Sequence, residues 1–282
     1  MASTGHLGLH LRSAPVAVTV TVTWVRTSCV LLRIGAVHLL TDPWFAVGMR
    51  GLPVFRKPSI LLKNLPKIDY ILASHLHPDH FDVDAVRELT GRGAVVVGTV
   101  GTAAHLHRHS VLAEVVELLP WQRWSHGGLN VVATPALHTG PKPDEIGIWF
   151  EMSGFRCYFA GDQRFGPVFA QVGARLPRVD LALLPIGGTL IFGHRTTMDP
   201  ADAVRAALVL RPRYILPIHE GGEWLPVPPA SWHPGRCRDF LAKLATSGLD
   251  AVGLDAPPGI AATIPFEHPD HRADGEARCP TG

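Results

Sequence analysis

The sequence has few cysteines, no long apolar run and no marked excess of either charge. Its four cysteines form no Cys-x-x-Cys pair, which argues against a zinc knuckle and a thioredoxin-like redox centre. No run of 18 apolar residues occurs, so we expect no transmembrane helix. Lysine and arginine (26) nearly balance aspartate and glutamate (24), and no basic stripe interleaved with aromatic residues appears. We therefore expect no nucleic-acid partner.

The composition is that of a chain with a large hydrophobic core. Of 282 residues, 46% are hydrophobic and 18% are charged, and no internal repeat or linker divides them. We expect one domain over residues 17–267, with flexible tails at residues 1–16 and 268–282. The first tail lacks the continuous apolar core of a signal peptide. Nothing in the cysteine pattern demands disulfides, which suits a cytoplasmic protein.

Short apolar runs predict many strands. Helices are expected between them where the apolar spacing becomes helical, as at residues 82–90, or where proline opens a polar–apolar segment, as at residues 200–210. Strands in the first half are expected to feed hairpins, and strands in the second half to alternate with helices. This mixture predicts an α+β, αββα sandwich, with two mixed sheets packed face to face and helices outside.

One segment of six residues concentrates metal-ligand chemistry. His75, His77, Asp79 and His80 directly follow the apolar run at residues 70–73. Neutral imidazoles and carboxylates are the ligands that zinc, iron and manganese accept. A solvated histidine-rich loop is the alternative, but four ligand-type side chains in six positions favour a metal site.

Three further ligand-type residues stand in the same local context. His138, Asp162 and His219 each follow a short apolar run that reads as a strand. Each histidine alone is more often structural than a ligand. Together with the first segment they repeat one arrangement, a strand followed by a ligand, and so predict ligands gathered at one sheet edge.

The order His-x-His-x-Asp-His, then His, then Gly-Asp, then His resembles the metallo-β-lactamase-fold hydrolases, from about Val18 to Pro265. Thr41-Asp42-Pro43 and residues 184–188 and 197–203 resemble its lactonase-like and N-acyl-phosphatidylethanolamine phospholipase D-like branch. Two stretches depart from that branch. A Gly-His pair common in its N-terminal hairpin is absent from residues 24–29, and the segment after His219 differs, so we expect a distinct substrate pocket.

The resemblance implies a dinuclear site. One divalent ion would be held by His75, His77 and His138, and a second by Asp79, His80 and His219, with Asp162 bridging them. Zinc is the expected metal, with manganese or iron as alternatives. A metal-bridging hydroxide would cleave a small ester-like bond in a small-molecule substrate, either a lactone or ester or a phosphodiester. Asp79 would also act as a catalytic proton carrier. A non-catalytic metal-binding scaffold or partner-binding module of the same fold is the alternative.

Asp42 and His194 are candidates for supporting roles. Asp42 is expected to orient a ligand histidine, although an Asp-Pro turn explains it equally simply. His194 is expected to donate a hydrogen bond to a developing oxyanion, with a solvated loop histidine as the alternative. Arg195 beside it would meet a phosphate or carboxylate if it is not merely an exposed cation.

The remaining aromatic and histidine clusters carry weaker expectations. Trp44, Trp224 and Trp232 flank metal-bearing loops and are expected to wall an apolar pocket, with core packing as the alternative. The alternating histidines at 105, 107 and 109 have no carboxylate nearby and are expected to lie at the surface.

Overall fold

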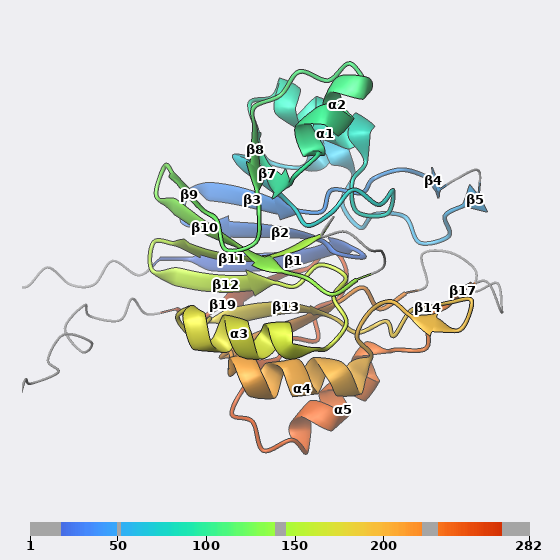
Figure 1. Ribbon diagram of the computed structural model, residues 1–282, viewed down its shortest axis with the longest axis vertical. Coiled ribbons are helices and arrows are strands. Elements are labelled where there is room, and N and C mark those ends of the chain that lie inside the picture. Colours follow the sequence, from blue (N-terminus) through green and yellow to red (C-terminus); the bar gives the residue numbers. More distant parts are fainter. Residues whose placement is uncertain (1–17, 50–51, 139–144, 222–230, 267–282) are drawn as a thin grey trace, which may run out of the picture.

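Two seven-stranded sheets stack face to face in the computed structural model, which describes residues 18–49, 52–138, 145–221 and 231–266 (Figure 1). The predicted αββα sandwich is confirmed. The two expected tails, residues 1–16 and 268–282, lie entirely outside the described residues.

The first sheet has the strand order β19-β1-β2-β3-β6-β7-β8. Its antiparallel half joins β19, β1, β2 and β3, and its parallel half continues from β3 through β6 and β7 to β8. The bounds are β1 Val20–Arg26, β2 Cys29–Ile34, β3 Val37–Thr41, β6 Tyr70–Ala73, β7 Val95–Thr99, β8 Val115–Leu118 and β19 Ala261–Ile264.

The second sheet has the order β18-β16-β13-β12-β11-β10-β9 and repeats the same plan. Strands β9 to β12 are antiparallel, and β12, β13, β16 and β18 are parallel. The bounds are β9 Arg123–His126, β10 Leu129–Pro135, β11 Ile146–Met152, β12 Phe155–Phe159, β13 Leu181–Pro185, β16 Tyr214–Ile218 and β18 Val252–Gly253. The expected contrast between a hairpin half and a helix-alternating half is therefore wrong, because each sheet combines both patterns.

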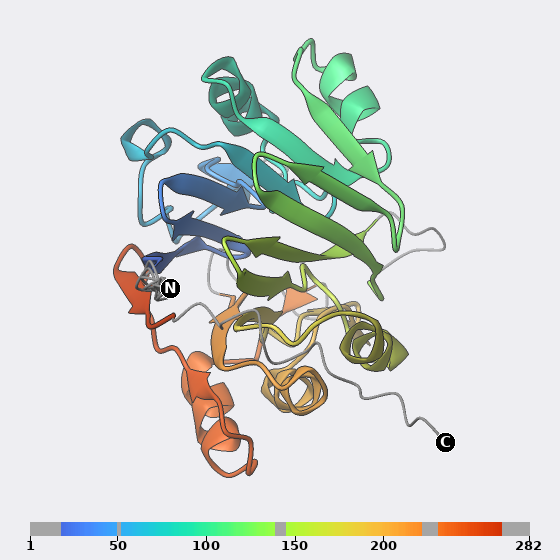
Figure 2. The ribbon, with the colours of Figure 1, turned by 90° about the vertical axis from the view of Figure 1, so that its left-hand side faces the viewer.

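Helices cover the outer face of each sheet (Figures 1 and 2). The first sheet carries α1 (Val83–Gly91) and α2 (Thr102–Arg108), and the second carries α3 (Pro167–Arg175), α4 (Pro200–Leu210) and α5 (Cys237–Ala245). The side chain of Asp82 caps α1 by accepting from the backbone N–H groups of Asp84 and Ala85. Asp199 caps α4 in the same way, and Pro200 occupies its first position. No helix in the described ranges is long and apolar enough to cross a membrane.

The main core lies between the sheets and follows the two-residue period of the strands. Val20, Val22 and Trp24 of β1 point into it, together with Phe150 of β11 and Phe159 of β12. Alternate residues face the helices in two further cores. Cys29 and Cys157 are buried thiols, as expected.

Several small elements supplement the two large sheets. They are the 3-10 helix η1 (Leu62–Asn64), the hairpin β4 (Gly48–Met49) and β5 (Leu52–Pro53), and a three-stranded sheet of β14 (Leu190–Ile191), β15 (His194–Arg195) and β17 (Ser231–Trp232). The hairpin and the small sheet lie toward the same end of the molecule in Figure 1.

Candidate metal centre

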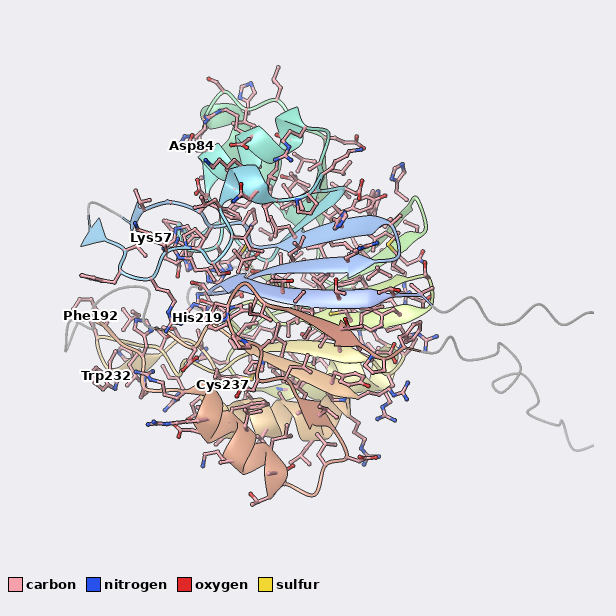
Figure 3. The ribbon with its side chains drawn as sticks, turned by 180° about the vertical axis from the view of Figure 1, so that it is seen from behind. Lys57, Asp84, Phe192, His219, Trp232 and Cys237 are labelled. Carbon is pink, nitrogen blue, oxygen red and sulfur yellow. The ribbon has the colours of Figure 1, made fainter. Side chains whose placement is uncertain are left out.

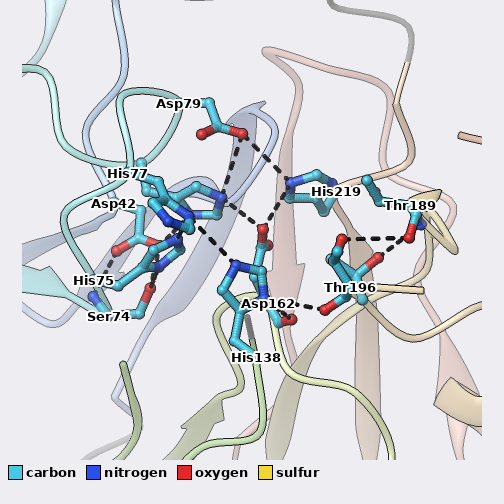
Figure 4. A network of polar contacts seen from close by, with 12 residues as sticks. Asp42, Ser74, His75, His77, Asp79, His138, Asp162, Thr189, Thr196 and His219 are labelled. Atoms are coloured by element: carbon cyan, nitrogen blue, oxygen red, sulfur yellow. Dashed lines mark hydrogen bonds and ion pairs between the residues drawn. The ribbon is translucent and has the colours of Figure 1, made fainter. Parts of the chain in front are cut away.

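The seven predicted ligands come together at the ends of four strands (Figure 4). The segment from His75 to His80 follows β6 of the first sheet, and a turn in which the His77 carbonyl accepts from the His80 and Phe81 N–H groups folds it back. His138, Asp162 and His219 follow β10, β12 and β16 of the second sheet. The site therefore joins both halves of the sandwich.

Three imidazoles, His75, His77 and His138, form what we call the imidazole set. His77 Nδ1 lies 2.9 Å from His75 Nε2 and 3.3 Å from His138 Nε2. One ring nitrogen can satisfy only one such contact as an N–H···N bond. Ligand nitrogens around tetrahedral zinc lie roughly 3.3 Å apart, given zinc–nitrogen distances of about 2.0–2.1 Å. The positions of the three nitrogens are therefore explained better by coordination of a shared cation than by hydrogen bonds among the rings.

Backbone contacts orient His138 for that task. Its Nδ1 lies 3.1 Å from the Asp162 carbonyl oxygen and 3.0 Å from the Thr196 carbonyl oxygen. Because carbonyls only accept, Nδ1 carries the hydrogen, and in the neutral ring the lone pair is on Nε2, which faces the other imidazoles.

Asp79, His80, Asp162 and His219 form the second group, the carboxylate set. Asp162 Oδ2 lies 3.1 Å from His80 Nε2 and 3.3 Å from His219 Nε2, and Asp79 Oδ2 lies 3.7 and 3.9 Å from the same nitrogens. His80 Nε2, His219 Nε2 and Asp162 Oδ1 are buried and have no hydrogen bond of regular geometry. Buried polar atoms of this kind are costly unless they are satisfied. This donor set also fits a divalent cation.

The two sets differ in their protonation. Burial, and next the charge on His80, holds the pKa of His75 well below its usual value. Burial, and next the charge on His138, lowers the pKa of His77. These rings stay neutral, so their lone pairs are free for a cation at neutral pH.

In the carboxylate set the ion pairs outweigh burial. Burial alone would lower the pKa of His80 and His219, but the Asp162 carboxylate raises both, that of His80 well above its usual value. Burial opposes the charged form of Asp162 as well, yet His219 and His80 hold its pKa well below the usual range. A cation must displace protons to enter this set.

Asp42 is positioned as the sequence suggested. Its Oδ2 lies 2.6 Å from His80 Nδ1, and the fully buried carboxylate also accepts from the Ser74 backbone N–H at 2.7 Å and hydroxyl at 2.6 Å. The Ser74 hydroxyl in turn lies 2.9 Å from His75 Nδ1. One carboxylate therefore orients a ligand of each set, directly for His80 and through Ser74 for His75.

Glu145 is a buried carboxyl group that sequence reasoning missed. Its Oε1 accepts from the Asp162 N–H at 2.6 Å, and its two oxygens lie 3.7 Å from Nδ1 of His75 and of His138. Burial, and next the nearby Asp162 charge, raises its pKa well above the usual value. A Cβ at Gly161 would lie 2.7 Å from Oε1, so this close approach requires glycine. A single glutamate before a strand gives no signal of this role in the sequence.

His233 is a second buried residue that the sequence did not indicate. Its Nδ1 lies 3.0 Å from the Thr189 hydroxyl, and its Cβ lies where a side chain at Gly221 would begin. Burial, and next the charge on His219, lowers its pKa to about 4. The ring is therefore neutral at physiological pH and lies close behind the last ligand.

His194 and Arg195 lie in the exposed strand β15 rather than in a loop. His194 pairs with Ile191, and Arg195 forms an ion pair of 2.9 Å with Asp199 at the start of α4. The oxyanion role of His194 stays a prediction.

The three tryptophans that were expected to wall a pocket have different outcomes. Trp44 is fully buried beneath the Arg26 guanidinium, 3.4 Å from the ring centroid, so the expectation that it walls an open pocket is wrong. Trp232 is 45% exposed in β17, and Trp224 lies outside the described residues. His107 and His109 are exposed at the end of α2, while the partly exposed ring of His105 contacts Phe81.

Comparison with known proteins fits this geometry. The sequence model of the Beta-lactamase superfamily domain matches residues 38–219, which are more than half of the chain and include all seven predicted ligands. The chain belongs to the metallo-β-lactamase superfamily. A metal-dependent hydrolase of Thermus thermophilus is 34% identical over 206 residues, which cover 71% of this chain and 83% of that protein.

Other superfamily relatives differ in length and in described activity. An uncharacterized protein of Mycobacterium tuberculosis is 32% identical over 219 residues, and the match spans 71% of this chain but only 58% of that protein. An N-acyl-phosphatidylethanolamine-hydrolyzing phospholipase D of Caenorhabditis elegans is 27% identical, with 71% and 63% covered. The metallo-hydrolase Igni18 of Ignicoccus hospitalis shares the fold, with a TM-score of 0.71, 23% identity, and coverage of 88% of this chain and all of that one.

Proposed function

We propose that this protein is a dinuclear metal-dependent hydrolase of a small ester-like bond. The observation that carries the proposal is the convergence of two adjoining sets of ligand-type side chains, whose lone pairs and buried polar atoms a divalent cation would satisfy. Divalent cations held there would supply Lewis acidity and lower the pKa of water toward neutrality. Zinc suits the imidazole set best, because three neutral imidazoles are a common zinc environment.

The chain's own residues supply the remaining functions. Asp79 is the most accessible of the carboxylate set, with 17% of its side chain exposed against 6% for Asp162. It is therefore the group placed to take a proton from the substrate side and return it to a leaving group. Asp162, between His80 and His219, fixes the spacing of the carboxylate set. His194 is the proposed donor to a developing oxyanion.

The named relatives support a hydrolytic reaction, but they do not identify which bond is hydrolysed. The Thermus protein is named a metal-dependent hydrolase, and the Caenorhabditis protein hydrolyses a phospholipid. Both carboxylic esters, including lactones, and phosphodiesters remain within the proposal, because each presents an oxygen that a cation can polarise and a leaving group that needs a proton.

Metal content and turnover measured together test the proposal. Protein purified without chelator should hold close to two equivalents of divalent metal by elemental analysis. The same preparation should hydrolyse members of a panel of aryl esters, lactones and bis-aryl phosphodiesters, and which of them react identifies the bond. Removal of the metal should abolish turnover, and zinc or manganese should restore it. Full metal content with no turnover across the panel would favour a non-catalytic scaffold.

A further inference from the structure

An aromatic ring stands exposed at the tip of the hairpin that supports His138. Phe192 joins β14 to β15 and is 70% exposed. The hairpin begins at its base with Thr189 and ends with Thr196, which are linked by a backbone hydrogen bond of 2.8 Å, and the Thr196 carbonyl faces His138 Nδ1 at 3.0 Å. The base of the hairpin is therefore part of the metal centre (Figure 4).

The backbone at this tip is unfavourable for phenylalanine. Phe192 has φ +46° and Gly193 has φ +80°, so both loop residues adopt the left-handed conformation of a type I′ turn. Asparagine, aspartate and glycine suit the first position of such a turn, whereas a bulky side chain is strained there. The chain thus accepts both backbone strain and an exposed aromatic ring at one position. Strain of this kind is typical of functional sites.

The ring lies within reach of a substrate bound at the metal centre. Three strand steps separate Thr189 from Phe192, a distance of roughly 10 Å at about 3.3 Å per residue. Figure 3 shows Phe192 and His219 toward the same end of the molecule. Ile191, which precedes Phe192 and pairs with His194, is 38% exposed, so the tip carries two exposed apolar side chains.

We infer that Phe192 is a specificity-determining residue that contacts an apolar alkyl chain carried by the substrate. The inference rests on the proposed function for the position of the reacting bond. The substrate class is then an ester with a chain of several carbons on the side of β14 and β15, held at one end by the metal centre and at the other by the ring. Burial of methylene groups against the ring provides the selectivity.

Binding of alkylphosphonates to the metal-loaded protein tests this without requiring turnover. The phosphonate group suits a divalent cation centre, and chains from ethyl to octyl probe the apolar contact. Calorimetry should show affinity rising about 2–4-fold for each methylene that reaches the ring. Phe192→Asn should flatten this dependence while leaving metal content and ethylphosphonate affinity unchanged.

Asparagine makes the substitution informative because it relieves the backbone. If Phe192 had only a structural role, Phe192→Asn would not change the dependence of affinity on chain length. Tm should rise by about 1–3 °C in this variant as the backbone strain disappears. Leu112→Asn is the matched control, since Leu112 is 90% exposed beside α2 and should alter neither slope nor metal content.

Two outcomes would overturn the inference. One is a parent protein that binds no member of the series or binds all members equally. The other is a variant Phe192→Asn in which affinity depends on chain length as steeply as in the parent protein. If that variant instead loses binding to phosphatidylcholine vesicles, the ring contacts a membrane surface rather than the substrate. The proposed hydrolase function fails separately, when no ester in the turnover panel reacts.

Discussion

The imidazole set and the carboxylate set lie side by side but differ in the charge and protonation of their side chains. His75, His77 and His138 are three rings without an opposing carboxylate among them, and burial keeps His75 and His77 neutral. In the other set, Asp162 already pairs with His80 and His219, whose pKa values it raises. The first set is ready for a cation, whereas the second must first give up protons. Ligand identity alone does not reveal this difference.

Asp162→Asn should give the largest effect, because it removes the carboxylate that pairs with His80 and His219 and that is predicted to bridge the two ions. We expect turnover to fall by about 10³-fold or more and metal content to fall toward one equivalent, since His75, His77 and His138 remain intact. Elemental analysis, turnover and thermal unfolding of one preparation check this. Loss of both equivalents would show that the sets are not separable, and retention of full activity would exclude the assigned role.

His194→Ala should leave both sets full and still slow the reaction. A lost oxyanion donor predicts a fall in kcat of about 10²-fold with metal content unchanged. A histidine that is merely solvated would change neither quantity. Lower metal content in this variant would mean that the residue acts on the ligands instead.

Glu145 tests whether the sets are independent, because its carboxyl group touches both. We expect Glu145→Met to weaken metal affinity by about 10–100-fold. Glu145→Gln keeps an acceptor for the Asp162 N–H and should recover most of the affinity. The unfolding temperature of chelated protein is the control, because Glu145→Met also leaves the buried Asp162 N–H without its acceptor, and this structural loss is the same with and without metal. Equal destabilisation with and without metal would reduce Glu145 to a structural residue.

Stability against pH should separate the sets in metal-free protein. Above pH 6.5, His75 and His77 are neutral in both folded and unfolded states and contribute nothing. His80 and His219 have raised pKa values in the folded state, so their contribution is present below pH 6.5 and is lost as pH rises through those values. Tm of chelated protein should therefore fall as the pH is raised above about 6.5. Asp162→Asn should flatten this trend, and a trend that persists in the variant would assign it elsewhere.

Much of the fold follows from local sequence. Continuous apolar runs such as β6 and β16 identify buried strands, and α4 was predicted with its observed bounds because proline marks its start. Strands β9 and β19 were missed. The first is polar, and the second is a short, half-exposed run whose partner, β1, lies at the other end of the chain.

The candidate site likewise contains residues that could be predicted from the sequence and residues that could not. The predicted ligands are recognisable because four lie in one segment and the other three follow strands. Glu145 and His233 could not be found, since their importance depends on which side chains surround them after folding. The misreading of Trp44 has the same origin, because only the structure places Arg26 over its ring.

The last ligand is held by the first hairpin, and the last described strand pairs with the first. The His219 N–H donates to the Thr27 carbonyl between β1 and β2, and Val20 of β1 pairs with Ile264 of β19. During synthesis the early half of the chain therefore leaves the ribosome with β1 as an open edge and with an incomplete set of ligands. The ligand set stays incomplete until His219 has been made, and β1 stays unpaired on one side until β19 has been made. Completion of the predicted ligand set therefore waits for β16, and closure of the first sheet waits for β19, so we expect metal capture to follow the docking of these late segments onto β1 and β2.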